Sequence, residues 1–156
     1  MRLAEYTDYS LRVLMYCAAR PQQMVTIAAL AEHHGVSRNH LMKIVTDLGR
    51  QGLLETTRGR GGGLRLLQDP ASIRIGDVVR ACETDFRLVE CFDERSNQCT
   101  LNPSCRLKGL FHAALRAYFQ ELDAMTLADI TLPVAAAAHP MVVPVAAPRR
   151  LRKPPA

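Results

Sequence analysis

The sequence predicts a mainly α-helical fold: a winged helix-turn-helix with a small β-hairpin wing, followed by a long C-terminal dimerisation helix. Three observations support this fold class. Apolar residues recur at helical spacing through the N-terminal third, with a glycine where a helix-turn-helix needs its sharp turn. A glycine-rich tip then joins two short apolar segments, and a long helix with an apolar stripe follows the middle of the chain.

The first two helices are predicted from apolar spacing and from the signals at their ends. A helix over residues 7–20 carries apolar residues three and four positions apart, and Pro21 stops it. A second helix covers residues 26–34 and opens at Thr26, a residue type that often caps helix N-termini. Together these helices form the support for a third.

The third helix is the candidate recognition helix. Gly35 permits the tight turn before it, Ser37 caps it and Gly52 ends it. Its apolar stripe follows the i, i+3, i+4, i+7 rule and consists of Leu41, Ile44, Val45 and Leu48. Because this stripe faces the second helix, the opposite face is free to meet DNA.

Two short strands and a further helix come next. The strands are predicted over residues 53–57 and 64–67, around a tip that reads Arg-Gly-Arg-Gly-Gly-Gly, and a short helix over residues 76–83. The predicted organisation is a winged helix-turn-helix DNA-binding domain at 1–84, a loop with three cysteines at 85–106, a dimerisation helix at 107–130 and a disordered Pro/Ala-rich tail at 131–156.

Charge is distributed unevenly along the chain. Residues 1–66 hold nine basic and five acidic side chains, whereas residues 67–132 hold seven basic and ten acidic ones. The formal net charge is +5. A basic N-terminal half beside an acidic middle is typical of a nucleic-acid-binding module joined to another unit.

Polar residues near the start of the third helix are the candidates for reading DNA bases. Arginine can bind guanine, and asparagine adenine, through paired hydrogen bonds. Arginines in a glycine-rich tip can approach phosphates or a minor groove closely. The candidate DNA-binding residues are Thr26, Ser37, Arg38, Asn39, His40, Lys43, Arg58 and Arg60. A small helical domain with a solvated basic face is the alternative.

Three cysteines, Cys91, Cys99 and Cys105, follow one another with C-x7-C-x5-C spacing. Clustered thiolates can hold a metal or an iron–sulfur cluster, and three of them leave a fourth position to be filled from elsewhere. The spacing lacks the close C-x2-C pair of most zinc modules, so zinc is a weaker alternative, as are three unliganded cysteines. Cys17 and Cys82 lie on apolar helix faces and are predicted core residues.

A cytoplasmic protein is expected. Charged residues interrupt the N-terminus, so no signal peptide is predicted, and no apolar run approaches the roughly 18 residues that span a bilayer. Five cysteines, an odd number, argue against a disulfide framework and for metal or redox chemistry in a reducing compartment.

A long helix is predicted over residues 103–127, with Asn102 as its cap and Pro103 in the first helical position. Its apolar stripe consists of Leu107, Phe111, Ala114, Tyr118, Leu122 and Met125. A helix this long and apolar needs a partner, and two-fold pairing would present two recognition helices to one operator. Packing of the stripe within its own chain is the alternative.

Several motifs resemble, in the same order, those of the iron–sulfur-containing winged-helix repressors. They are the opening Thr7-Asp8-Tyr9-Ser10-Leu11-Arg12, the helix-turn-helix, the glycine-rich wing from Arg58 to Leu64 and the three-cysteine segment. Within that family, the sequences at 88–91, 103–108 and 122–129 look most like the nitric-oxide-sensing repressors. The resemblance covers about residues 1–130.

The resemblance implies a homodimer with one iron–sulfur cluster per subunit, [4Fe–4S] in preference to [2Fe–2S]. Cys91, Cys99 and Cys105 match the family's ligand positions. Asp8 matches a carboxylate that some members supply to the cluster from the partner subunit. The relative that senses cluster supply has a histidine three residues after its third cysteine, where this chain has Lys108, so that relative is disfavoured.

The expected function is therefore that of a nitric-oxide-responsive transcriptional repressor, and not of an enzyme. The resemblance implies that the cluster-bearing dimer binds double-stranded operator DNA and releases it when the cluster is nitrosylated. An iron- or redox-responsive regulator of the same family is the first alternative. A zinc-stabilised DNA-binding module and a small electron carrier are the others, and the DNA-reading residues disfavour the electron carrier.

Overall fold

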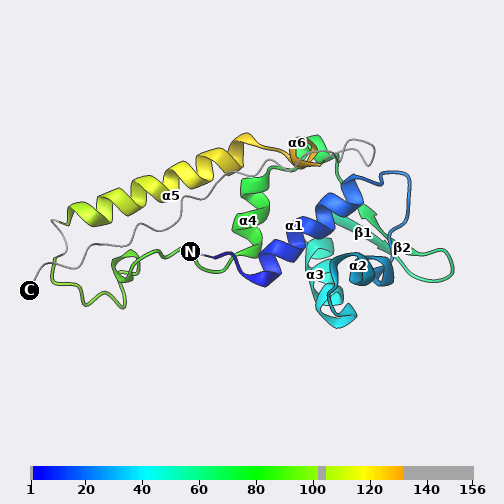
Figure 1. The fold of residues 1–156 in the computed structure, drawn as a ribbon, viewed down its shortest axis with the longest axis horizontal. Coiled ribbons are helices and arrows are strands. Elements are labelled where there is room, and N and C mark those ends of the chain that lie inside the picture. The colour runs from blue at the N-terminus through cyan, green and yellow to red at the C-terminus, as the bar shows by residue number, and fades with distance from the viewer. Residues whose placement is uncertain (1, 102–104, 132–156) are drawn as a thin grey trace, which may run out of the picture.

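The structure, a computed structural model, describes residues 2–101 and 105–131. In chain order its elements are α1 (Glu5–Ala18), α2 (Ile27–His34), α3 (Arg38–Arg50), β1 (Leu54–Thr57), β2 (Gly63–Leu66), η1 (Pro70–Ser72), α4 (Ile75–Cys82), η2 (Glu90–Phe92), α5 (Arg106–Ala124) and α6 (Leu127–Ile130). Figure 1 shows a body formed by α1 to α4, the hairpin and α6, from which α5 extends. The helices and the hairpin confirm the predicted fold class.

The helix-turn-helix forms as its turn and cap residues predict. Gly35 ends α2 with a φ of 65°, a left-handed conformation that glycine adopts without strain. The Ser37 hydroxyl accepts a hydrogen bond from the His40 backbone N–H at 3.3 Å and so caps α3. Leu30 of α2 and Leu41 of α3 are fully buried, so the two helices share one core.

The wing is fixed to the chain that precedes α2. Strands β1 and β2 are antiparallel, and an isolated bridge joins Leu64 to Val25 through hydrogen bonds of 2.9 and 2.8 Å. At Gly63 a Cβ atom would lie 2.6 Å from the Val25 carbonyl oxygen. Only glycine therefore lets the wing approach this closely.

The first helix is displaced from its predicted position. It covers Glu5–Ala18 instead of residues 7–20. The Glu83 carboxylate, which follows α4, accepts hydrogen bonds from the Ala4 backbone N–H and the Thr7 hydroxyl, both at 2.9 Å. These bonds satisfy donors at the start of α1 from a distant part of the chain, a contact that local sequence does not encode.

The prediction of a single long helix over residues 103–127 is wrong at the C-terminal end. Helix α5 ends at Ala124, because Met125 is extended and its carbonyl accepts the Ile75 backbone N–H at 3.0 Å. Thr126 then caps α6 in a capping box, and the fully buried Leu127 joins the core of the body. Residues 107–130 therefore belong to two helices: α5, which extends from the body, and α6, which is part of the body.

The N-terminal end of α5 also differs from the prediction. Cys105 is the N-cap residue of the helix instead of a member of its first turn. The predicted cap Asn102 and the first helical Pro103 lie outside the described residues, as does the tail from residue 132 onward. No helix in the described ranges combines the length and apolar character that crossing a bilayer requires.

Candidate DNA-binding surface and cysteine segment

The first turns of α3 present the predicted base-reading residues to solvent. Arg38, Asn39 and Lys43 are exposed, and His40 is half-buried. The exposed Met42, 49% accessible, lies on the same outward part of the helix and was not among the predicted residues. Met42 falls between Leu41 and Ile44 of the apolar stripe, so helical periodicity could have predicted that its side chain faces outward.

The other predicted DNA-binding residues fall into two groups. The Thr26 hydroxyl accepts the Ala29 backbone N–H at 3.1 Å, so Thr26 caps α2 as Ser37 caps α3. Arg58 and Arg60 are exposed in the tip between β1 and β2. The caps orient the helices, whereas the two arginines are free to contact phosphate.

A chain of contacts joins Asp8 of α1 to the recognition helix. Asp8 and Arg12 form an ion pair of 2.8 Å, and the Arg12 guanidinium lies 5.3 Å from the centre of the Tyr9 ring. Tyr9 in turn packs edge-to-face against His40, with ring centroids 5.6 Å apart. The i, i+4 spacing of Asp8 and Arg12 could have predicted the ion pair, but the contact with α3 depends on the fold.

A second contact between α1 and α3 lies further along the recognition helix. The Tyr6 hydroxyl donates to the Asp47 carboxylate at 2.9 Å, and Asp47 also pairs with Arg50 at 3.2 Å. Burial, together with the Asp47 carboxylate, raises the pKa of Tyr6. The orientation of α3 is therefore set from two points on α1.

The five cysteines divide as the sequence predicts into core and segment residues. Cys17 and Cys82 are 2% and 5% exposed in the core, and burial raises the pKa of Cys17 to about 12. Cys91 lies in η2 at 9% exposure, while Cys99 and Cys105 are half-buried. All five are free thiols.

The donor set of the cysteine segment fits an iron–sulfur cluster by its chemistry. Thiolates are the ligands that such clusters use, and three free thiols lie in one short segment. Over residues 2–101 and 105–131, however, no three His, Cys, Asp or Glu side chains are arranged to hold a metal ion. The structure therefore does not bring Cys91, Cys99, Cys105 and Asp8 together.

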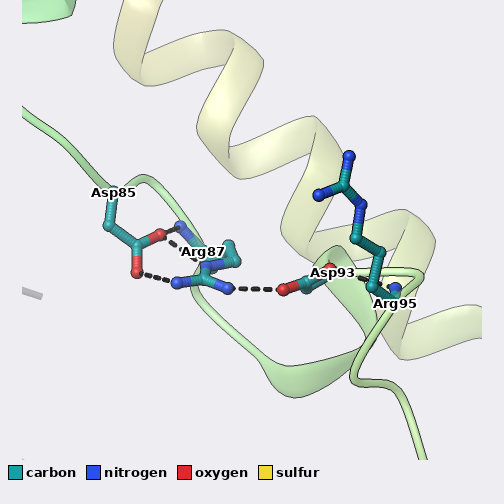
Figure 2. Close-up of polar contacts among 4 residues, drawn as sticks. All are labelled: Asp85, Arg87, Asp93 and Arg95. Atoms are coloured by element: carbon teal, nitrogen blue, oxygen red, sulfur yellow. Dashed lines mark hydrogen bonds and ion pairs between the residues drawn. The ribbon is translucent and has the colours of Figure 1, made fainter.

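Exposed ion pairs order the part of the segment around Cys91. Figure 2 shows the Arg87 guanidinium between the carboxylates of Asp85 and Asp93, at 2.8 and 2.6 Å. Hydrogen bonds from Arg87 lower the pKa of Asp85 to about 2. The pKa of Asp93 is also lowered, mainly by the Arg95 backbone N–H. Sequence reasoning did not predict this network.

Helix α5 is docked at one end and uncovered at the other. Near its C-terminal end, Asp123 forms a bidentate ion pair with Arg80 of α4 at 2.6 and 2.7 Å, and Phe119 packs against Phe86. Near its N-terminal end, Leu107 and Leu110 are 54% and 63% exposed. Of the predicted apolar stripe, Leu122 packs against the core of the body, whereas Leu107 stays exposed.

Helix α3, the second helix of the helix-turn-helix, exposes a basic face beside the glycine-tipped wing. This arrangement defines a winged-helix DNA-binding protein. Solved structures share this fold. The IscR protein of T. potens aligns with a TM-score of 0.66 at 24% identity, over 83% of this chain and 85% of that one. The oxidized form of Staphylococcus aureus CymR aligns with a TM-score of 0.69 at 24% identity, over 86% and 98%.

The chain belongs to the Rrf2 family, described as "Iron-dependent Transcriptional regulator", which it matches over residues 3–132. A Bacillus subtilis protein named HTH-type transcriptional regulator NsrR is 52% identical over 131 residues, which are 83% of this chain and 90% of that protein. A protein of the same name from Shouchella clausii is 47% identical over 133 residues, 85% and 89% of the two chains. The chain is thus a transcriptional regulator and not an enzyme, and the resemblance seen in its motifs is confirmed.

Proposed function

We propose that the chain is a nitric-oxide-responsive transcriptional repressor that acts in the cytoplasm and binds palindromic operator DNA as a homodimer. The observation that carries the proposal is the presence, in one chain, of an exposed recognition helix and three free cysteines that lie close together in the sequence. The signal follows from the nitric-oxide-sensing repressors that the motifs resemble, and the relatives named NsrR cover both parts of the chain.

The uncovered end of α5 supports the homodimer. Leu107 and Leu110 would each leave more than half of their surface in water in a lone chain. Burying such leucines against a second copy stabilises association by about 25 cal/mol for each Å² of apolar surface removed from water. A two-fold pairing through α5 also places two α3 helices for two half-sites.

Cys91, Cys99 and Cys105 would hold the cluster, [4Fe–4S] in preference to [2Fe–2S], with Asp8 of the partner subunit as a fourth ligand. When bound, the cluster supplies irons that react with nitric oxide. Figure 1 shows α5 leading away from the body that contains α1, which suits a ligand from a second copy better than the chain's own Asp8.

The contacts of Asp8 provide a route from the cysteine segment to DNA. In the free chain Asp8 pairs with Arg12, which lies over Tyr9, which packs on His40 of α3. If Asp8 is engaged by a partner subunit, Arg12 loses its carboxylate and the packing of Tyr9 on the recognition helix changes. Gain or loss of the Asp8 bond would thereby alter operator affinity.

Operator binding before and after nitric oxide tests the proposal. The protein is purified without oxygen, its operator is selected from a random DNA pool, and binding is measured during titration with nitric oxide. We expect a brown protein whose operator affinity falls as nitric oxide is added. A colourless protein with bound zinc would favour the zinc module, and release by oxidants or iron chelators but not by nitric oxide would favour the iron- or redox-responsive alternative.

Cysteine and aspartate variants test the ligands. Cys99→Ala should lose both iron and operator binding, whereas the core variant Cys82→Ala should keep both. Asp8→Ala should still bind iron on three thiolates, but with an altered absorption spectrum and weaker coupling to DNA. Normal iron content in Cys99→Ala would reject the cysteine assignment, and an unchanged spectrum in Asp8→Ala would reject the carboxylate.

A further inference from the structure

One arginine holds both ends of the turn that carries Cys91. The Arg87 Nε and Nη2 atoms donate to the two carboxylate oxygens of Asp85, at 2.9 and 2.8 Å. Its Nη1 atom donates to Asp93 at 2.6 Å, as Figure 2 shows. Asp85 precedes Cys91 and Asp93 follows it, so a single guanidinium closes the turn. A planar group with five N–H donors can bind two carboxylates in this way.

Other contacts complete the same turn. The Asp93 backbone N–H donates to the Glu90 carbonyl at 3.1 Å, and the Glu90 carboxylate accepts the Gln98 backbone N–H at 2.6 Å. The Phe92 ring stacks on His112 of α5, with centroids 4.1 Å apart and planes 5° from parallel. The turn is thus closed by charges and docked on α5 by one aromatic ring.

Burial of the Cys91 thiol contrasts with the exposure of its charged surroundings. Cys91 is only 9% exposed, while the side chains of Arg87 and Asp85 are 52% and 46% exposed. The aromatic side chains of this stretch, Phe86 and Phe92, are only half-buried, and they pack on Phe119 and His112 of α5. Among the contacts that hold this turn, the ion pairs of Arg87 are the ones that tie both of its ends to a single side chain.

We propose that Arg87 is a positioning residue that closes the Cys91 turn and so sets this thiol in place before any cluster is bound. The use of this positioning in cluster binding rests on the proposed function. The positioning itself is a property of the protein alone, so it can be tested without iron.

Thiol labelling of metal-free protein tests the role of Arg87. Folded protein is treated with N-ethylmaleimide, and the rate at each cysteine is followed by peptide mass spectrometry. Arg87→Ala should accelerate labelling of Cys91 by roughly three- to tenfold, because three charge-assisted hydrogen bonds, in two ion pairs, are lost. Arg87→Lys should give an intermediate rate, since an ammonium cannot reproduce the two-sided contact. Labelling of Cys17 and Cys82 should stay slow, which would show that the body remains folded.

Arg95→Ala is the matched control. It removes the same charge from the same segment, but among the described contacts Arg95 contributes only its backbone N–H, which donates to Asp93 at 3.0 Å. Figure 2 shows its guanidinium pointing away from Asp93. Labelling of Cys91 in this variant should match that of wild type.

The outcomes separate the positioning role from the proposed function. Equal labelling of Cys91 in wild type and Arg87→Ala would overturn the positioning role, as would equal acceleration by Arg95→Ala or at the core cysteines. Anaerobic loading with iron and sulfide is then measured separately. Wild type that takes up no iron would refute the proposed function and leave the labelling result standing. Faster loss of iron from Arg87→Ala than from Arg95→Ala would support both.

Discussion

The close approach of the wing to the chain before α2 makes Gly63 a sensitive position of the hairpin. Changing Gly63→Ala places a methyl group 2.6 Å from the Val25 carbonyl oxygen and 3.2 Å from the Met24 Cβ atom. The first of these atoms belongs to the backbone, so no side-chain rotation relieves the contact. The bridge between Val25 and Leu64, with its two hydrogen bonds, must open.

The size of the effect follows from these contacts. Overpacking of this kind costs about 1–3 kcal/mol, and each backbone hydrogen bond contributes about 0.5–1.5 kcal/mol. Alanine recovers about 0.5–1 kcal/mol relative to glycine in a strand. The overpacking and the two lost bonds exceed this gain, so we expect the free energy of unfolding to fall by about 1–5 kcal/mol.

Urea denaturation followed by circular dichroism, at one fixed protein concentration, measures this change in stability. Gly49→Ala in α3 is the control, because its new methyl group would meet only the Leu54 carbonyl oxygen at an ordinary 3.7 Å. That variant should be neutral or up to about 1 kcal/mol more stable. A loss below about 0.5 kcal/mol for Gly63→Ala, the range of ordinary surface changes, would refute the reasoning.

Three further predictions concern DNA binding and titration. Arg38→Ala should weaken operator binding by about 1–3 kcal/mol and have little effect on binding to random DNA. Arg60→Ala should weaken binding to both DNAs equally and reduce the dependence of binding on salt concentration. Gel shifts in a salt series measure both effects, and the reverse pattern would contradict this assignment. The pKa of Asp85 is depressed to about 2 by Arg87, so its contribution to stability is complete above its unfolded pKa of about 3.9 and is lost as the pH falls through about 2. A carboxyl NMR titration with an ordinary midpoint would contradict that assignment. Cys17, with its pKa raised to about 12 by burial, should resist iodoacetamide at pH 8 until urea unfolds the chain, and prompt reaction in the folded protein would show an open core.

The parts of the fold that the sequence predicts are those encoded by local spacing. The stripe that includes Leu41 and Leu48, the glycine turn at Gly35 and the cap at Ser37 each act within a few residues, and all appear where expected. Burial of Cys17 and Cys82 follows from the same periodicity, because an apolar helix face must be covered.

The parts that the sequence does not predict depend on residues far apart in the chain. Apolar periodicity continues past Ala124, and only pairing of Met125 with Ile75 in the folded chain ends the helix there. The ion pairs of Arg87 with Asp85 and Asp93 lie in a loop whose residues show no helical or strand periodicity. Charged residues of both signs are common in such loops, so no sequence pattern predicted these ion pairs. The contact between the Tyr9 and His40 rings likewise forms only when α1 packs on α3.

The return of the chain at α6 has a consequence for the order of events during synthesis. Arg74 bridges Thr126, and Leu127 fills the core of the body beside residues made much earlier. A ribosome delivers the N-terminal residues first, so the body lacks this part of its interior until the cysteine segment and α5 have also emerged. A truncated product ending before α6 would expose the place of Leu127 and become a target for proteases. The DNA-reading body of the chain is therefore completed only after the cysteine segment and α5 have been made.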